Sequence, residues 1–410
     1  MRRDPSKTPR RAVVVGAGPV GCLAARLLAA RGFTVEVVEK RPSFENGLSE
    51  EGRTINLSIS PRGLAALQLS GVADEFAAMS VPMGYRIIHA INGACETTKY
   101  GTNDRQCHSV GRNALNLLLF RDARQHGVQF RFHTQAVELD SGARRLFFTD
   151  AAANTTEHSY DLLVGADGAF STIRTQLAAA GAINASTSTL DLAYAELNLT
   201  SQGGGFLFES SAIHIWPRGG YFMIGLPNTD GTFKCTLVVP AEGSMSFSKM
   251  RAGGLASLLK VSFPDAYPYL DRAEEDTLDR PAGTITTVAC DALHCGESVL
   301  LMGDAAHAIA PFLGQGINLG FEDCVVLDDL LARQGDDLAA ICRAFTAERQ
   351  PNVDAAAALS MANYRQLVRT DVRHMETSNA IGDVRDADPL VVMVNFLGLP
   401  YAEVQRRLMT

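Results

Sequence analysis

Apolar and polar positions follow three different patterns along the chain. At the N-terminus, residues 12–15 form a short apolar run, residues 19–31 place Ala and Leu on one helical face, and residues 33–39 are again mostly apolar. This order predicts a buried strand, a helix and a second strand. The N-terminal segment is therefore expected to form a βαβ unit.

Later segments repeat this pattern of strands and helices. The pattern predicts a helix at residues 111–127 and one alternating strand at residues 128–140. The stretches "YDLLVGADGAFSTIRTQLA" and "LLMGDAAHAIAPFLGQGINLGFED" each predict a strand, a turn and a helix. Residues 323–410 are rich in Ala and Leu and have a helical pattern.

The middle of the chain has the third pattern. Between residues 191 and 289, short alternating segments such as "AIHIWP", "GYFMIGLP" and "FKCTLVVP" are separated by Gly, Pro and Asn. Such spacing predicts a mostly antiparallel sheet. Because α/β segments flank this β-rich segment, the first domain is expected to be discontinuous in sequence.

Composition narrows the class of protein. The chain has 410 residues, of which 46% are apolar and 20% charged, as in folded globular proteins with two domains or one large domain carrying an insertion. A net charge of -8 argues against nucleic acid as a partner, because phosphate binding needs a basic face. The eight cysteines contain no CxxC pair, so we expect reduced, buried thiols and neither a zinc site nor a disulfide framework.

No segment has the character of a signal peptide or a membrane span. The basic start, "MRRDPSKTPRR", leads directly into the first strand, and the apolar stretch at residues 389–400 is shorter than the roughly 20 residues that cross a bilayer. We therefore expect a soluble, cytoplasmic protein with no membrane partner. Nothing in the sequence indicates its oligomeric state.

A dinucleotide site is predicted at the N-terminus. Gly16, Gly18 and Gly21 form GxGxxG between a strand and a helix, where glycines permit the tight turn and the approach of a pyrophosphate to free amides. Glu39 ends the second strand, where a carboxylate can accept a hydrogen bond from a ribose hydroxyl. A lone GxGxxG can be only a glycine-rich turn, but here strand, helix and acidic residue agree. The motif does not separate FAD from NAD.

The stretch from Leu300 to Asp323 has two interpretations. Asp304 and His307 could form an acid/base site, or the glycines could present backbone amides to a large anionic group. Together with "DLLVGADGAFSTIR", this stretch resembles the GD and DG motifs of flavoprotein aromatic hydroxylases of the p-hydroxybenzoate hydroxylase type. The resemblance favours the second interpretation: Asp304 would be an FAD ligand, and His307 would only hold the loop.

The resemblance also implies a set of cofactor contacts. The DG segment would lie near both FAD and the pyridine nucleotide, and the helix that follows the glycines would face the flavin ring. Beyond the GxGxxG glycines and Glu39, the residues that it assigns to the cofactor site are Arg41, Arg112, Asp167, Asp304, Gly314, Gln315, Gly316 and Asn318.

Further segments narrow the resemblance to the kynurenine 3-monooxygenase family. They include "GRTINLSISPRGLAAL", "RIIHAINGACETTKYG", "IHIWPRGGYFMIGLPN", "FPDAYP" and "PYAEVQRR", in the family's order over nearly the whole chain. The resemblance implies that Arg86, Tyr100, Asn363 and Tyr401 bind a substrate carboxylate. It places Phe233, Ile224, Pro311 and Phe312 in an apolar slot beside the flavin. Taken singly, Arg86 could be a surface cation and Tyr100 a packing aromatic residue.

The implied fold is α/β: a Rossmann-like FAD-binding domain, a mostly antiparallel β-sheet substrate domain and a helical C-terminal region that closes the substrate pocket. The expected boundaries are 1–80, 101–190 and 290–345 for the first domain, 81–100 and 191–289 for the second, and 346–410 for the helical region.

The implied activity is hydroxylation of L-kynurenine at ring position 3, with tightly bound FAD, NADPH or NADH as a transient reductant, and O2 as co-substrate. No acid/base residue is assigned, because the aniline nitrogen itself activates the ring. The chain departs from the family pattern at Gln366, where a glutamate is usual, and in "LAYAEL". A substituted kynurenine, another aromatic acid or an antibiotic-pathway intermediate therefore stays open as the substrate, as does a non-enzymatic FAD-binding scaffold. A plain NAD-dependent dehydrogenase is disfavoured by the GD segment.

Overall fold

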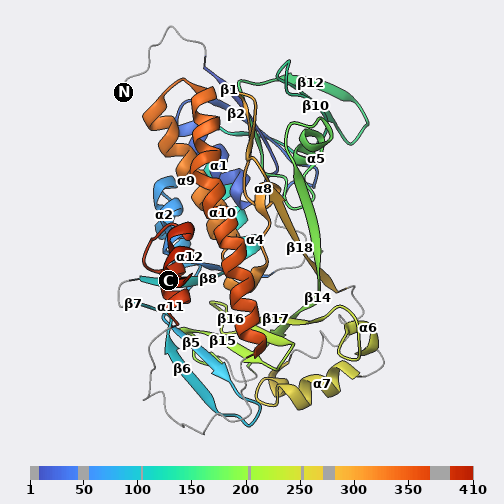
Figure 1. The fold of residues 1–410 in the computed structure, drawn as a ribbon, viewed down its shortest axis with the longest axis vertical. Coiled ribbons are helices and arrows are strands. Elements are labelled where there is room, and N and C mark those ends of the chain that lie inside the picture. Colours follow the sequence, from blue (N-terminus) through green and yellow to red (C-terminus); the bar gives the residue numbers. More distant parts are fainter. Residues whose placement is uncertain are drawn as a thin grey trace.

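The computed structural model describes residues 9–44, 55–102, 105–201, 205–250, 254–270, 282–369 and 388–409. Its ribbon has a helix-covered parallel sheet near one end and a large twisted sheet near the other (Figure 1). The long helix α10 (Leu338–Arg369) runs along the molecule and reaches toward both ends.

The first sheet has six strands in the order β19-β20-β13-β1-β2-β9. These strands are β1 (Arg11–Val15), β2 (Thr34–Val38), β9 (Gln129–Arg131), β13 (Leu162–Gly165), β19 (His294–Cys295) and β20 (Val299–Leu301). The pairs β1–β2, β1–β13, β13–β20 and β2–β9 are parallel. Strands of this sheet come from the N-terminal, central and late parts of the chain, so the domain is discontinuous in sequence.

Helices cover this sheet and bury the largest apolar core of the described residues. The predicted βαβ unit is present, because α1 (Pro19–Ala30) links β1 to β2. Helix α1 packs against α4 (Arg112–Gln125) and α9 (Gly316–Gln334), and α9 packs against α2 (Pro61–Ser70). The short helices α3 (Ala73–Ala78), α5 (Thr172–Ala179) and α8 (Asp304–His307) complete this part.

The prediction of one strand over residues 128–140 is wrong. Residues 129–131 form β9 at the edge of the parallel sheet, whereas β10 (Gln135–Asp140) pairs with β11 (Arg145–Thr149), which pairs with β12 (Thr155–Ser159) in a separate sheet. Between the two strands, His133 has a φ of 51°, outside the β region. The alternation of side chains continues through this break, which is why the pattern alone did not reveal it.

The second large sheet has seven strands in the order β18-β14-β17-β16-β15-β5-β6. These strands are β5 (Tyr85–His89), β6 (Cys95–Lys99), β14 (Ala185–Leu199), β15 (Ala212–Pro217), β16 (Phe222–Pro227), β17 (Phe233–Pro240) and β18 (Gly283–Cys290). All of its described pairs are antiparallel except β5–β15. The mostly antiparallel sheet predicted from the sequence is thereby confirmed.

Two features of this half differ from the sequence analysis. Helices α6 (Phe247–Met250) and α7 (Gly254–Ser262), with the turn η1 (Tyr267–Tyr269), cover one face of the seven-stranded sheet in a region where only strands were expected. Strand β4 (Val81–Met83) pairs with β8 (Arg105–Gly111), and β8 also pairs with β3 (Asn56–Ile59) and β7 (Gly101–Thr102). Strand β4 thus belongs to a small sheet beside the parallel-sheet domain.

The C-terminal region consists of α10, α11 (Pro389–Asn395) and α12 (Tyr401–Met409), as the helical pattern indicated. Helix α10 packs against α9, α12 and the turn η3 (Pro311–Leu313). The α/β fold class with its second, mostly antiparallel sheet is confirmed, while the domain boundaries stay a prediction. Within the described part of the chain, no helix combines the length and the apolar character needed to cross a membrane.

Candidate active site

A cavity of about 660 Å³ lies between the parallel-sheet domain and one face of the seven-stranded sheet. Its walls come from β1, β2, β3, α4, the segment after β13, η3 and the start of α9 on one side, and from β5 and β14–β18 on the other. Residues far apart in the sequence therefore share one cavity. Most of the residues predicted for cofactor or substrate lie along its walls.

The glycine-rich turn forms the end of the cavity where β1 meets α1. Gly16 has a φ of 106°, and a Cβ atom there would lie 2.4 Å from the carbonyl oxygen of Ala166. A Cβ at Gly21 would lie 2.0 Å from the oxygen of Gly16, whereas one at Gly18 would meet no atom within 4 Å. Gly16 and Gly18 line the cavity and Gly21 lies behind them. The first turn of α1 has no side-chain cap and no acidic residue, so its amides remain available to an anion.

Glu39 lies at the same end, but both of its oxygens already accept hydrogen bonds. Its Oε2 accepts from the amide of Ala17 at 2.9 Å, and its Oε1 accepts from the amide and Nε of Arg41, both at 2.9 Å. Burial alone would raise the pKa of Glu39, but the hydrogen bonds and charge of Arg41 hold it below the usual value. Glu39 and Arg41 both line the cavity, so the pair braces the turn while presenting an ionised carboxylate.

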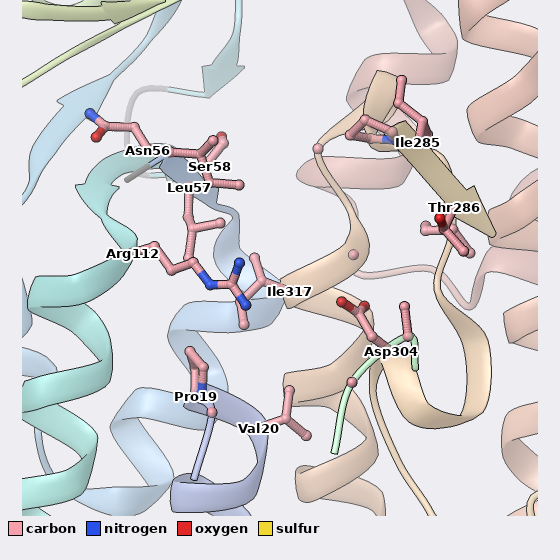
Figure 2. Close-up of a pocket in the computed structure, with 18 of the residues that line it drawn as sticks. Pro19, Val20, Asn56, Leu57, Ser58, Arg112, Ile285, Thr286, Asp304 and Ile317 are labelled. Atoms are coloured by element: carbon pink, nitrogen blue, oxygen red, sulfur yellow. The ribbon is translucent and has the colours of Figure 1, made fainter. Parts of the chain in front are cut away.

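Arg112 and Asp304 face each other across the middle of the cavity (Figure 2). Arg112 is the first residue of α4, and its side chain projects between Pro19 of α1 and Ile317 of α9. Asp304 is the first residue of α8, beside Thr286 of β18. Both residues are exposed to the cavity, so a cation and a carboxylate are available to a bound molecule.

The DG segment follows β13. The Oδ2 atom of Asp167 accepts from the amides of Thr172 and Ile173 at 2.7 and 3.3 Å, and thereby caps the start of α5. Burial raises the pKa of the Asp167 carboxyl despite these bonds. Asp167 and Gly168 line the cavity, as does the exposed ring of Phe170.

His307 does not line the cavity. Its Nε2 lies 2.6 Å from Oδ2 of Asp323, a carboxylate that also accepts from the amide of Gly303 and, through Oδ1, from Nε of Arg349. Arg349 in turn donates to Glu322 at 2.6 Å. Burial alone would raise the pKa of Asp323, but the charges of His307 and Arg349 hold it low. His307 thus anchors the GD turn to α9, in agreement with the structural role suggested from the sequence.

The glycines of the stretch that was expected to face the flavin lie at the cavity, but two polar residues beside them do not. Gly314 and Gly316 line the cavity, whereas Gln315 is 1% exposed and turned away. Its Oε1 accepts from the hydroxyl of Tyr401, and its Nε2 donates to Asn395, both at 2.8 Å. The Gln315 side chain is therefore not positioned to contact a ligand in the cavity.

The side-chain amide of Asn318 is likewise hydrogen-bonded within the protein. Its amide nitrogen donates to the carbonyl oxygens of Ser58 and Gly314 at 2.9 Å, and its oxygen accepts from the amide of Ser60 at 2.9 Å. The side chain therefore joins α9 to β3 and to the glycine turn, and it does not line the cavity.

The hairpin β5–β6 brings two predicted substrate residues together. Arg86 lies on β5 and Tyr100 follows β6, and both line the cavity. The Nε atom of Arg86 is buried and has no hydrogen-bond partner among the described residues, and burial lowers the pKa of its guanidinium. The buried ring of Tyr100 packs edge-on against Phe396 at 5.4 Å. A buried cation beside a phenol is suited to an anionic ligand group.

Tyr401 does not join the other residues that were predicted to bind the substrate carboxylate. It is fully buried, does not line the cavity and donates a hydrogen bond from its hydroxyl to Gln315. Its ring lies 4.3 Å from the guanidinium carbon of Arg62. The sequence placed Tyr401 beside a substrate because a motif gives the type and order of residues. It does not give which residue accepts a hydrogen bond from the Tyr401 hydroxyl.

Strand alternation explains which apolar residues reach the cavity. On β17, Thr236 and Val238 line the cavity, and on β16 Phe222 and Ile224 do so. Phe233 is three positions before Thr236, so its side chain points to the opposite face, where it packs with the residues under α6 and α7. The prediction that Phe233 lines the slot is wrong for this reason.

The turn η3 and helix α10 close the slot. Pro311, Phe312 and Asn363 line the cavity, and the Asn363 amide donates to the carbonyl oxygen of Phe312 at 2.6 Å. The ring of Phe312 stacks on Tyr364 at 4.5 Å. This contact fixes the turn against α10 and keeps one side of the slot apolar.

Several lining residues were not singled out from the sequence. Tyr194, Thr236, Val238 and Asn395 all line the cavity. The alternation of β14 and β17 contained the signal for three of them, but the sequence did not show which face of the sheet meets the cavity. Among the described residues, no cluster of three or more His, Cys, Asp or Glu side chains is arranged to hold a metal ion.

Comparison with known proteins gives one family. A family model described as FAD binding domain matches residues 10–218 and 270–360. Kynurenine 3-monooxygenase of Xanthomonas euvesicatoria pv. vesicatoria is 39% identical over 365 residues, which cover 88% of this chain and 80% of that protein. The enzyme of the same name from Stenotrophomonas maltophilia is 36% identical over 407 residues, covering 96% of this chain and 89% of that protein.

Solved structures share the fold at lower identity. A tetrameric form of 2-methyl-3-hydroxypyridine-5-carboxylic acid oxygenase superposes with a TM-score of 0.73 at 23% identity, covering 90% of this chain and 95% of that one. The p-nitrophenol 4-monooxygenase of Pseudomonas putida has a TM-score of 0.71 at 18% identity, covering 89% and 91%.

Proposed function

The chain belongs to the kynurenine 3-monooxygenase family of FAD-binding proteins, and from this premise we propose that it hydroxylates L-kynurenine, or a close substituted kynurenine, at ring position 3. It is an FAD-dependent aromatic monooxygenase that uses NAD(P)H and O2. The observation that supports this substrate class best is Arg86, a guanidinium at the cavity whose buried Nε has no hydrogen-bond partner among the described residues.

The residues along the cavity fit FAD. The open space at Gly18, where a Cβ would meet no atom within 4 Å, leaves room for a pyrophosphate at the uncapped start of α1. Arg112, exposed in the middle of the cavity, supplies a cation for the phosphates, and Asp304 supplies an acceptor for the ribityl hydroxyls. The start of α9 at Gly316 would lie along the flavin ring, where amides and the helix dipole favour negative charge.

When bound, FAD would supply the redox chemistry by which one oxygen atom of O2 is transferred to the substrate ring, with NAD(P)H as the source of electrons. The protein's task is to orient the ring and to exclude water. Phe222, Ile224, Val238 and Phe312 form an apolar slot on the sheet side of the cavity. An aryl ring in this slot would have its amino-acid end directed to the hairpin β5–β6.

The carboxylate of the substrate would be held by Arg86 and Tyr100. A guanidinium can donate two parallel hydrogen bonds to one carboxylate, and the phenol adds a third directed bond. The pair lies on one hairpin, so the two donors keep a constant separation. We assign the substrate carboxylate to these two residues, with Asn363 at the edge of the site through its contact with Phe312.

The direct test is to incubate the purified holoenzyme with L-kynurenine and NADPH, follow NADPH oxidation, and identify the product by mass and chromatography. We expect 3-hydroxykynurenine. Stimulation of NADPH oxidation by another aromatic acid, with no reaction of kynurenine, would favour a hydroxylase of different substrate. The absence of substrate-stimulated oxidation with every aromatic acid would favour a non-enzymatic FAD-binding role.

Replacing Arg86 with alanine should raise KM for L-kynurenine strongly while FAD stays bound. Loss of a charge-assisted contact weakens binding by about 1.5–3 kcal/mol. The matched control is Lys99→Ala, which removes an exposed cation from the same hairpin. KM should be unchanged in the control. An Arg86→Ala enzyme with wild-type KM would remove the assignment of the carboxylate site.

A further inference from the structure

A chain of hydrogen-bonded rings lies on the face of the seven-stranded sheet opposite to the cavity. Nε2 of His89 lies 2.8 Å from Nδ1 of His214, and Nδ1 of His89 lies 2.8 Å from Oδ2 of Asp265. The indole nitrogen of Trp216 donates to both oxygens of Asp265, at 3.0 and 3.1 Å. The three ring side chains are buried, and Asp265 is 23% exposed. We call these four residues the ring relay.

The partners determine where the ring protons lie. Nε2 of His214 lies 2.8 Å from the carbonyl oxygen of Glu209, which can only accept, so this nitrogen carries a proton. Burial, with the nearby charge of His89, lowers the pKa of His214 to about 3. His214 is therefore neutral, and its Nδ1 accepts a hydrogen bond from Nε2–H of His89.

The other nitrogen of His89 faces a carboxylate. Burial alone would raise the pKa of Asp265, but its hydrogen bond with His89 and the charge of that ring lower it, so Asp265 is an ionised acceptor. Nδ1 of His89 lies 2.8 Å from this carboxylate, and the His89 ring stacks on Trp216 at 4.3 Å and 20°. The relay thus contains a hydrogen-bonded His–Asp pair.

The relay spans the junction between β5 and β15. Strand β5 joins the sheet through β15, while its other neighbour is the edge strand β6. The β5–β15 pair is the one parallel pair among the described strands of this sheet, and parallel pairing is slightly less stable per residue. His89 lies on β5 and His214 on β15. Their hydrogen bond therefore crosses this junction, and Asp265 ties it to the segment after α7.

The same hairpin carries the proposed carboxylate site on its other face. Arg86 is three positions before His89 on β5, so the two side chains point to opposite faces. Because Nε of Arg86 has no hydrogen-bond partner among the described residues, the backbone of β5 has a large part in setting where the guanidinium lies. A shift of β5 against β15 would move Arg86 relative to the apolar slot.

We propose that His89 and Asp265 are positioning residues for the substrate carboxylate site: their hydrogen bond, with that of His89 to His214, holds the β5–β6 hairpin against β15, and so keeps Arg86 and Tyr100 at the distance from the slot that an amino-acid substrate requires. The proposal rests on the proposed function, because it assumes that Arg86 binds a carboxylate. Neither residue touches the substrate, and both act through β5.

The test compares two variants of the holoenzyme, Asp265→Asn and Leu259→Ala. Leu259 is a buried residue of α7 and lies outside the relay, so its truncation loosens the packing of α7 on the same face of the sheet. Binding of L-kynurenine and of 2-aminoacetophenone, which lacks the amino-acid group, is measured from the change in flavin absorbance. Asp265→Asn should weaken L-kynurenine binding about tenfold or more and leave the neutral ketone unaffected. Leu259→Ala should lower the melting temperature without changing either Kd.

A double-mutant cycle with Arg86→Ala then separates positioning from general damage. If the relay acts through Arg86, Asp265→Asn should cause no further loss of L-kynurenine binding in the Arg86→Ala background. Trp216→Phe keeps the stacked ring but removes the indole donor, and it serves if Asp265→Asn does not fold. It should weaken L-kynurenine binding in the same selective way.

The outcomes are distinct. Equal Kd values for L-kynurenine in the wild type and in both relay variants would overturn the positioning role, as would additive losses in the cycle or an equal effect of Leu259→Ala. Wild-type enzyme that binds L-kynurenine without hydroxylating it would instead overturn the proposed function.

Discussion

At the scale of residues, the polar side chains of the site fall into two groups. Arg86, Arg112 and Asp304 line the cavity and offer their groups to a ligand. Gln315 and Tyr401 have their polar atoms engaged with each other and with the protein. The first group can bind FAD or substrate directly, whereas the second holds the loops that do. Substitutions in the two groups should therefore change different quantities.

Replacing Tyr401 with phenylalanine should lower stability and leave KM near the wild-type value. The change removes the only described donor to Oε1 of Gln315, and a buried acceptor left without its partner costs about 1–3 kcal/mol. Urea unfolding and steady-state kinetics measure the two effects. Tyr269→Phe, at a ring that is 38% exposed, is the matched control. An increase of KM comparable to that of Arg86→Ala would instead place Tyr401 at the substrate.

Replacing Glu39 with glutamine should reduce the pH dependence of stability. The pKa of Glu39 is lower in the folded protein than its usual value of 4.5, so the folded state binds fewer protons than the unfolded state. The carboxylate's contribution is complete above about pH 4.5 and is lost as the pH falls through the folded pKa. Glu39→Gln should be less stable at pH 7 and lose less stability between pH 7 and the acid range. Parallel pH profiles of the two proteins, measured by urea unfolding, would contradict this.

At the scale of elements, close contacts between backbone segments and the alternation of the strands position the site. The β1–α1 turn fits against the segment after β13 because Gly16 has no Cβ, and α1 fits against the turn because Gly21 has none. The slot is formed where alternate residues of β16 and β17 point to one face of the sheet. The elements are therefore placed by backbone geometry, and the choice of a single residue decides whether an element can approach its neighbour.

Alanine at Gly18 and alanine at Gly21 should have different effects. A Cβ at Gly21 would lie 2.0 Å from a backbone oxygen, so Gly21→Ala should destabilise the fold with or without FAD. A Cβ at Gly18 meets no protein atom within 4 Å, so Gly18→Ala should fold normally and lose FAD affinity. Thermal unfolding of the apo-proteins and FAD titration distinguish the two. Normal FAD binding by Gly18→Ala would show that the pyrophosphate lies elsewhere.

At the scale of the whole molecule, the cavity joins parts of the chain that are distant in sequence. Arg112 from α4 and Asp304 from α8 face each other across it, and β5 and β16 supply the opposite wall. A cofactor in this position would connect these parts and stabilise the folded state by mass action. The stability of the protein should accordingly depend on FAD.

Added FAD should raise the free energy of unfolding by about 2.7 kcal/mol at a concentration of about 100 times its Kd. Arg112→Ala should weaken FAD binding and reduce this gain at the same FAD concentration. Arg121→Ala, at an exposed position of the same helix, is the control and should behave as wild type. Equal stabilisation of all three proteins by FAD would exclude Arg112 from the cofactor site. The measurement is chemical unfolding with and without the cofactor.

The sequence alone determined the βαβ unit, the antiparallel character of the middle segment and the motifs that indicate FAD. Local periodicity and glycine spacing are sufficient for the first two features and for a dinucleotide site, because each depends on neighbours in the chain. The choice of FAD came from the resemblance of the DG and GD segments to a known family. The sequence also grouped Arg86 with Tyr100, and both line the cavity.

Tertiary structure alone decided which candidates reach the cavity. Phe233 and Val238 are apolar residues of one strand that point to opposite faces of the sheet. The elements that pack on the sheet determine which face meets the cavity. Tyr401 does not line the cavity, and its hydroxyl donates a hydrogen bond to Gln315, a contact between residues 86 positions apart. The ring relay depends likewise on the pairing of β5 with β15. Such long-range contacts leave no local pattern, so only the folded chain reveals them.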